Sequence, residues 1–232
     1  MTAVLSKLIS EKFNKVTGIE ALPLEAFCDL DAPVSSHADM LLCVIEKNVF
    51  CYEKYCLENA RIFDKISSLG YNVIKVKKPC SKEYPGDIAL NVLIMGKTLF
   101  CNIKNIAVEI INFAKSNGYK IVNVKQGYSA CSTLILDERH AISADPSIIS
   151  ALKREGKKVF EISPEGISLD GYGCGFIGGA SGVSGKKVYF FGDYKSHPSH
   201  AEIDAFLNKN GFEPIKISDT KLCDFGGIKF LL

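Results

Sequence analysis

His37 and Asp39 are separated by a single residue in the segment SHADM, and they carry an imidazole and a carboxylate, which suit proton transfer and cation binding. On a strand, alternate side chains point to the same face, so both groups would lie together, as a shared site requires. We therefore predict that this segment contributes to one site. The structural alternative is that Asp39 caps a loop and that His37 is an ordinary residue at the rim.

The chain contains nine cysteines, a high and odd number. Their spacing is irregular and includes no CxxC pair, so it indicates neither a zinc module nor a disulfide scaffold, and reduced thiols in a cytoplasm fit better. Only a thiolate is a strong nucleophile, so most of these residues need another explanation. We expect Cys43, Cys51 and Cys101 to be buried as small apolar side chains.

Two further motifs resemble ligand sites but have simpler explanations. His197 and His200 form an HxxH pair, which supplies two metal ligands without a third and lies where a helix begins. The stretch from Gly171 to Gly185 contains GxGxxG as GCGFIG, but it runs into a strand-like segment, whereas a dinucleotide fingerprint must open a helix. We predict no metal and no cofactor, and expect these glycines to let backbone approach backbone, or alternatively a ligand.

Length alone allows one large domain or two small ones, since the chain has 232 residues. A hydrophobic fraction of 47% and a charged fraction of 23% exclude a disordered chain. The formal net charge of +2 and the lack of a long basic segment argue against nucleic acid as a partner. The longest aliphatic stretch is too short to span a membrane, and Lys7 and Glu11 interrupt any signal-peptide core. We expect a cytoplasmic protein.

One pattern recurs five times along the chain: a helix ends in glycine and an alternating strand follows at once. The five junction glycines are Gly18, Gly70, Gly118, Gly156 and Gly211. A glycine after the last helical turn adopts the left-handed conformation that satisfies the final carbonyls, and alternation of apolar and polar residues is typical of a strand. Each glycine therefore marks a predicted helix-to-strand junction.

Apolar residues at helical spacing precede these junctions. The predicted helix faces begin with Leu5 and Leu8 in the first helix, Leu57 in the second and Ile103 in the third. Paired strands precede the later helices, as in DMLLCVI followed by NVFCYE, so the repeating unit is strand, strand, helix, strand.

Four complete units occupy about residues 37–218. The N-terminus supplies a helix and a strand, and the C-terminal segment KLCDFGGIKFLL supplies only strand material, so together they make most of a fifth unit that looks one strand short. The glycine spacing measured through both ends falls within the range of the other intervals. We therefore predict a single domain of residues 1–232, closed into a ring by both termini.

A ring of five ββαβ units resembles the pentein fold, a five-bladed pseudosymmetric α/β propeller. The resemblance implies kinship with guanidino-group-modifying enzymes, which include agmatine and arginine deiminases, dimethylarginine hydrolases and amidinotransferases. The segments QGYSACSTLILD, GYGCGFIGGASG, FFGDYKSHP and CDFGGI are similar to those of an uncharacterised bacterial branch of this superfamily. The fold also carries a translation factor that blocks ribosomal subunit joining, so it does not assign a function by itself.

In such a ring, the first strand of each unit faces the axis, and five loops surround one cavity. The corresponding segments are SHADM, YPGDI, YSACST, GGASG and DFGGI. The candidate site residues that they bring to the axis are His37, Asp39, Asp87, Cys131, Ser132, Ser181 and Asp224.

The resemblance assigns roles to some of them. SHADM is similar to the His-x-Asp segment of agmatine deiminases, which implies that His37 transfers protons and that Asp39 pairs with a cationic group. Asp87 could share that cation, or it could be a turn residue. The superfamily's nucleophile is a cysteine in the last unit, but here Lys229 and Phe230 stand where it is expected.

Cys131 is our substitute nucleophile, because it follows SHADM by two units, the order found in the enzymes. Two functions remain open. The first is a hydrolase or transferase that acts on a small guanidine or amidine through Cys131 and His37, with Asp87, Ser132, Ser181 and Asp224 binding the substrate. The second is a noncatalytic pentein that binds a small ligand or a macromolecule. We expect a small cationic ligand and no nucleic acid or membrane partner.

Overall fold

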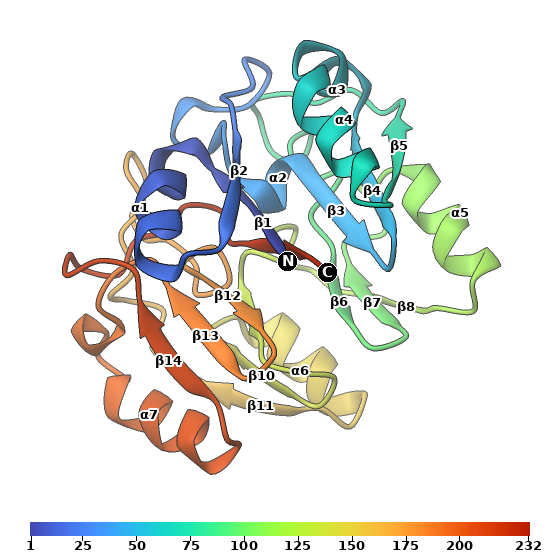
Figure 1. Ribbon diagram of the computed structural model, residues 1–232. Helices are drawn as coiled ribbons and strands as arrows, with labels where there is room; N and C mark the ends of the chain where they lie inside the picture. The colour runs from blue at the N-terminus through green and yellow to red at the C-terminus, as the bar shows by residue number, and fades with distance from the viewer.

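The computed structural model describes all 232 residues and contains five three-stranded sheets arranged as a ring (Figure 1). In every sheet, one outer strand pairs antiparallel with the central strand, which pairs parallel with the third. A helical connection links the two parallel strands on the outside of the ring. The ring of five strand, strand, helix, strand units that the glycine spacing predicts is therefore confirmed.

Four sheets are built from consecutive strands. The second unit contains β3 (Leu42–Ile45), β4 (Asn48–Tyr52), α3 (Glu53–Glu58), α4 (Ala60–Ser68) and β5 (Asn72–Val76). The third contains β6 (Leu93–Met95), β7 (Thr98–Cys101), α5 (Val108–Ser116) and β8 (Lys120–Asn123). The fourth contains β9 (Thr133–Ile135), β10 (His140–Ser143), α6 (Pro146–Arg154) and β11 (Lys158–Glu161). The last contains β12 (Ser181–Ser184), β13 (Lys187–Phe190), α7 (His200–Lys209) and β14 (Glu213–Lys216).

The remaining sheet joins the two ends of the chain. It consists of β1 (Thr2–Ser6) and β2 (Glu20–Leu24), linked by α1 (Lys7–Thr17), together with β15 (Lys229–Leu231). Thr2 pairs with Leu231, so the two termini lie side by side (Figure 1). The closure of the ring by both ends is thus confirmed, and β1 is the strand that the sequence pattern lacked.

Three expectations about helix starts are wrong. Leu5 belongs to β1, whose residues are all buried, and Leu8 is 71% exposed on α1. Leu57 is exposed on α3, which ends before Asn59 separates it from α4. Ile103 lies in a turn before α5. In the first and third cases, a strand or a turn occupies residues whose apolar spacing also fits a helix, whereas Leu57 lies in a helix but is exposed.

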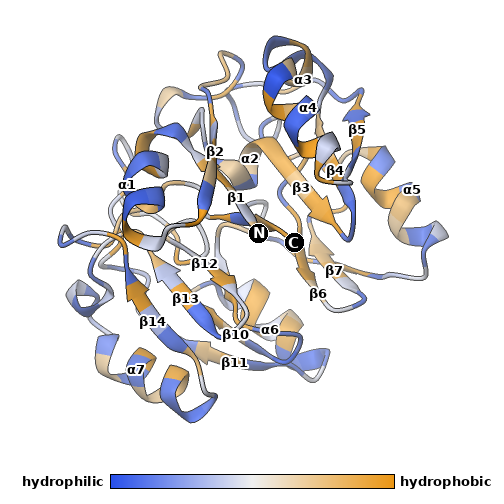
Figure 2. Ribbon diagram, viewed as in Figure 1, coloured by the Kyte–Doolittle hydropathy of each residue, from blue (hydrophilic) through white to orange (hydrophobic).

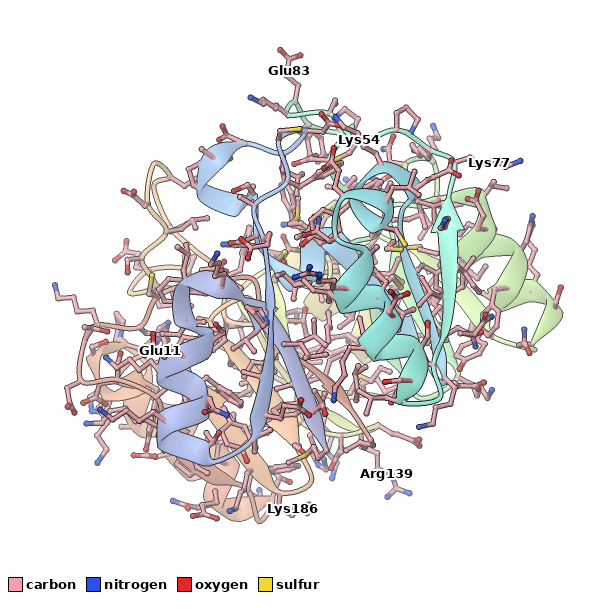
Figure 3. The ribbon with its side chains drawn as sticks, turned by 45° about the horizontal axis from the view of Figure 1, so that its top comes forward. Glu11, Lys54, Lys77, Glu83, Arg139 and Lys186 are labelled. Atoms are coloured by element: carbon pink, nitrogen blue, oxygen red, sulfur yellow. The ribbon has the colours of Figure 1, made fainter.

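The core lies between the sheets and the surrounding helices. Its largest cluster packs around Phe27, Phe50 and Tyr55. Figure 2 shows β3 as strongly hydrophobic, whereas hydrophilic residues cover parts of α1 and α7. Charged side chains such as Glu11 and Arg139 extend outward (Figure 3). None of the helices combines the length and the apolar character needed to cross a membrane.

Three short helical segments complete the chain and lie outside the repeating pattern. They are α2 (Ala38–Leu41) and the 3-10 turns Ala32–Val34 and Tyr194–Ser196. The first of these, α2, directly precedes the inner strand of the second unit and carries part of the predicted site.

Candidate functional site

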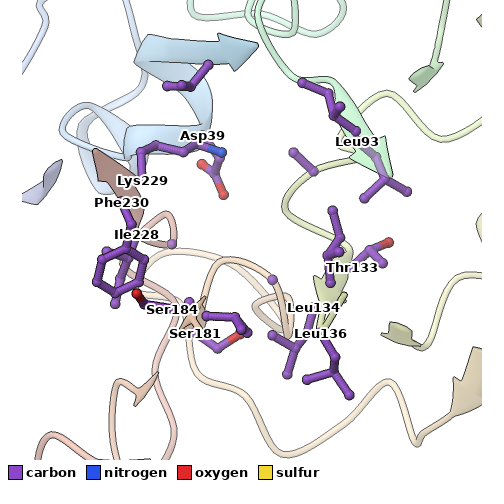
Figure 4. A pocket seen from close by; sticks show the side chains of 18 of the residues that line it. Asp39, Leu93, Thr133, Leu134, Leu136, Ser181, Ser184, Ile228, Lys229 and Phe230 are labelled. Atoms are coloured by element: carbon purple, nitrogen blue, oxygen red, sulfur yellow. The ribbon is translucent and has the colours of Figure 1, made fainter. Parts of the chain in front are cut away.

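A cavity of about 500 Å³ lies at the centre of the ring and is lined by residues of all five inner strands (Figure 4). Most of its wall is apolar, with residues such as Val44, Leu93 and Leu134. The only charged residues in the lining are Asp39 and Lys229. The lining therefore combines one acidic and one basic residue with mostly apolar side chains, and the Asp39 oxygens themselves are buried within the wall.

His37 and Asp39 do not lie on a strand, so the predicted alternation is wrong. His37 is the N-cap of the one-turn helix α2, and β3 begins only at Leu42. The Asp39 amide donates to the carbonyl of Gly226 at 3.0 Å, which attaches α2 to the C-terminal loop. Both side chains are nonetheless buried near the axis, because the helix starts where the chain enters the ring.

His37 is paired with Asp224. Its Nδ1 lies 3.7 Å from Asp224 Oδ1, and both side chains are almost completely buried. Asp224 accepts hydrogen bonds from the amides of Phe176 and Gly226, each at 2.9 Å. Burial raises the pKa of Asp224, His37 lowers it, and the nearby Asp39 carboxylate raises it. The pair is therefore a buried acid and base in contact.

Glycines in two motifs make room for this pair. A Cβ atom on Gly226 would lie 2.3 Å from His37 Cβ, and one on Gly179 would lie 2.1 Å from Asp224 Oδ1. A Cβ on Gly178 would lie 2.4 Å from the carbonyl oxygen of Ala130. The expectation that the glycine-rich segment permits close approach of backbone is confirmed at Gly178, whereas Gly179 and Gly226 make room for side chains of the pair.

Cys131 is a buried thiol whose sulfur lies beside both the Asn91 amide and the Asp39 carboxylate. Its Sγ accepts a hydrogen bond from Asn91 Nδ2 at 2.9 Å, and the residue is only 4% exposed. Burial raises the pKa of the Cys131 thiol well above its usual range, and the nearby carboxylates of Asp39 and Asp224 raise it further, against the Asn91 hydrogen bond. In this state the sulfur is a neutral thiol, not an activated thiolate.

Asn91 was not among the predicted residues, although it holds two site segments together. Its Nδ2 also donates to the carbonyl of Asp39 at 3.1 Å, and its Oδ1 accepts from the amide of Ala130 at 2.7 Å. The available signal was a single amide side chain inside the apolar run IALNVLIM.

Asp39 has the least compensated charge in the site. The residue is 2% exposed, and its carboxylate has no N–H or O–H donor, only the Cys131 thiol beside it. An ionised carboxylate without partners is costly to bury, because desolvation is not offset by pairing. Asp39 also lines the central cavity, so a ligand there could supply the missing partner.

Asp87 lies in a neighbouring polar pocket and does not line the cavity. Its Oδ2 accepts from the Tyr128 hydroxyl at 2.6 Å, its Oδ1 has no partner, and its carbonyl accepts from the Tyr52 hydroxyl at 3.2 Å. Burial raises the pKa of Asp87, although the Tyr128 hydrogen bond opposes the shift.

The hydroxyl groups of the two predicted serines donate hydrogen bonds to backbone carbonyls. Ser132 Oγ donates to the carbonyl of Tyr128 and Ser181 Oγ to that of Ile177, both at 2.6 Å. Only Ser181 lines the cavity. The structure thus groups His37, Asp39, Cys131 and Asp224, while Asp87 lies apart and the serines brace turns.

The cysteines and histidines outside the site have ordinary environments. Cys43, Cys51 and Cys101 are buried on β3, β4 and β7, as expected for small apolar residues. His197 Nδ1 accepts from the amide of Ser199 at the start of α7, which agrees with the helix-start interpretation of that segment.

Residues 4–229 match the profile of a family of unknown function, DUF6873. The chain belongs to this family. No curated protein matches the sequence of this DUF6873 chain.

Solved structures similar to the DUF6873 chain share its fold at low sequence identity. One is DDAH from Pseudomonas aeruginosa in complex with citrulline, with a TM-score of 0.56 and 10% identity over 94% of this chain and 91% of that chain. Another is an amidinotransferase of the saxitoxin pathway from Microseira wollei, with a TM-score of 0.62 and 10% identity over 97% of this chain and 80% of that chain. A third is the inosamine-phosphate amidinotransferase from Streptomyces griseus. Its TM-score is 0.57, and its sequence is 10% identical over 97% of this chain and 78% of that chain.

These structures belong to the pentein superfamily, and the five-unit ring of the DUF6873 chain has the same architecture. The predicted resemblance to an uncharacterised branch of the penteins is therefore confirmed. At 10% identity, these similarities describe the fold.

Proposed function

We propose that the protein binds a small guanidine or amidine cation at Asp39 and that Cys131 and His37 carry out hydrolysis or amidino-group transfer on it. The observation that carries this proposal is the Asp39 carboxylate, buried at the cavity wall with no N–H or O–H donor and beside the Cys131 thiol. A guanidinium presents planar N–H donors that match the two oxygens of a carboxylate. The pentein neighbours, two of them described as amidinotransferases, support the same substrate class.

Cation binding also supplies a means of activating Cys131. The carboxylates of Asp39 and Asp224 raise the pKa of the Cys131 thiol, so a cation at Asp39 would offset part of that shift. The Asn91 amide, which donates to the sulfur, would favour the resulting thiolate. The substrate therefore helps to generate the nucleophile that attacks it.

The chemical steps follow from these groups. The Cys131 thiol gives its proton to His37, and the resulting thiolate adds to the amidine carbon and forms a C–S bond. The C–N bond to the leaving amine then breaks, and His37, supported by Asp224, donates a proton to that nitrogen. The amidino group next passes from sulfur to water or to an acceptor amine, and this step regenerates the thiol.

Binding and turnover of a simple substrate test the proposal. Isothermal titration with methylguanidinium should show binding to the wild type and to Cys131→Ser, and at least roughly tenfold weaker binding to Asp39→Asn. Release of ammonia from agmatine, and release of putrescine when hydroxylamine is present as acceptor, should fall at least roughly a thousandfold in Cys131→Ser. Cys101→Ser, a buried strand cysteine, is the matched control. Equal turnover by Cys131→Ser and wild type would exclude the mechanism.

A noncatalytic pentein that binds the same cation is the second candidate. It is favoured by the raised pKa of Cys131 and by the absence of this residue from the cavity lining. Iodoacetamide labelling separates the two functions. Without ligand, the exposed Cys28 and Cys174 should react first; with methylguanidinium, a catalytic Cys131 should become more reactive, whereas a merely structural one should stay protected.

A further inference from the structure

Lys229 lies next to Asp39 in the wall of the central cavity (Figure 4). It is half-buried on β15, and Figure 4 shows its side chain crossing the cavity wall with the ammonium end turned toward the Asp39 carboxylate. The two groups do not form an ion pair within 4.0 Å, and no N–H or O–H group donates to either Asp39 oxygen. Lys229 is the only cationic residue of the cavity lining.

The strand directs Lys229 to this position. On β15, Phe230 packs against Phe13 and Tyr189 beneath α1, whereas Lys229 lies close enough to Cys43 on β3 to lower the pKa of that thiol, against the larger effect of burial. β15 pairs with β1, and both Lys229 and Phe230 contribute to the cavity lining.

We propose that Lys229 is the resident counter-ion of Asp39 and competes with the ligand for the cation site. This inference rests on the proposed function for the nature of the ligand. In the unliganded protein, the flexible ammonium offsets part of the charge of a buried, unpaired carboxylate. A guanidinium that binds Asp39 must displace this ammonium or lie next to it, and either event weakens binding.

Lys229 thereby limits which cations can bind to Asp39. A monocation with a single weak contact cannot displace a tethered ammonium, whereas a planar cation that bonds both oxygens of Asp39 can. The cavity therefore selects bidentate amidinium groups over simple alkylammonium ions of similar size.

A double-mutant cycle tests the pairing without any ligand. Lys229→Met should lower the melting temperature when Asp39 is present and should have no such effect, or the opposite one, in Asp39→Asn. Equal effects of Lys229→Met in the two backgrounds would overturn the inference. Lys229→Gln provides a second variant if the methionine variant does not fold, and Lys187→Met on the neighbouring sheet is the control, since Lys187 is exposed.

Ligand titration tests the competition. Lys229→Met should bind methylguanidinium roughly tenfold more tightly than wild type and should also bind butylammonium, which wild type should not. If wild type binds methylguanidinium, unchanged or weaker binding by Lys229→Met would overturn the inference. If the cycle shows coupling and butylammonium binds Lys229→Met, but methylguanidinium binds no variant, then the proposed function is wrong and the pairing of Lys229 with Asp39 stands.

Discussion

Asp87 is a buried carboxylate with one bonded and one unbonded oxygen. Tyr128 donates to Oδ2, while Oδ1 has no partner. Burial raises the pKa of this group in the folded protein. A carboxyl group whose pKa rises on folding favours the native state when protonated and opposes it when ionised. Its contribution to stability is therefore complete at low pH and is lost as the pH rises through the raised pKa.

Asp87→Asn should remove this loss. The amide oxygen can accept the Tyr128 hydrogen bond without a buried charge, so we expect the variant to be more stable than wild type at neutral pH by on the order of 1 kcal/mol. Urea unfolding from about pH 4 to about pH 8 should show a smaller decline in the free energy of unfolding for the variant. A variant less stable than wild type at neutral pH would show that ionised Asp87 has a favourable partner.

The residues of the site could be predicted only in part. The ring placed His37, Asp39, Cys131 and Asp224 near one axis, and the structure groups them, while their chemical roles stay predictions. Asn91 escaped prediction because its contacts with Asp39 and Cys131 join residues 52 and 40 positions away, and no local pattern encodes such contacts.

At the scale of elements, helix termini carry clear chemical signals. Asp145 caps α6: its Oδ1 accepts from the Ile148 amide at 2.9 Å and its Oδ2 from Gln126 Nε2 at 2.8 Å. Pro146 follows at the first helical position, where its missing N–H costs nothing. The cap therefore fixes both the start of the helix and the loop before it.

Asp145→Ala should reduce the free energy of unfolding by about 1 to 2 kcal/mol, because two orphaned donors lose their acceptor. Chemical denaturation measures the change. Ser150→Ala, at an exposed position within the same helix, should be neutral or slightly stabilising. If both substitutions had the same effect, the cap would contribute nothing specific.

The elements were predictable where one residue type enforces a backbone conformation. All five junction glycines have positive φ angles, between 69° at Gly18 and 82° at Gly70. The first residue of a strand was less predictable, because it is determined by pairing with a neighbouring strand. Leu42 begins β3 where it pairs with Cys51 on β4. The segment just before it was therefore free to form a helical turn, and the predicted strand at His37 and Asp39 was wrong.

At the scale of the whole molecule, the ring has no natural first unit. The ends meet in one sheet, with Thr2 opposite Leu231, and the contacts around the axis do not depend on where the chain is cut. This closure was predictable from glycine spacing, which repeats through the termini. The central cavity and the positions of its two charged residues were not, because they depend on how five strands converge.

A circular permutant should therefore fold. Joining Leu232 to Met1 through a short flexible linker and opening the exposed loop between Lys82 and Glu83 should preserve the free energy of unfolding to within about 2 kcal/mol. Removal of residues 227–232 should instead abolish cooperative unfolding, because β1 loses its antiparallel partner. Urea denaturation followed by circular dichroism distinguishes these outcomes; a stable truncated chain would contradict the closed ring.

The pairing of β1 with β15 also has a consequence for synthesis in the cell. The ribosome releases β1 first, but the strand that completes its sheet emerges only after the four other units. During this interval, β1 presents an open, apolar edge, the feature by which unfinished sheets associate with other chains. The nascent protein can thus fold most of its length and still need protection at its first five-residue strand.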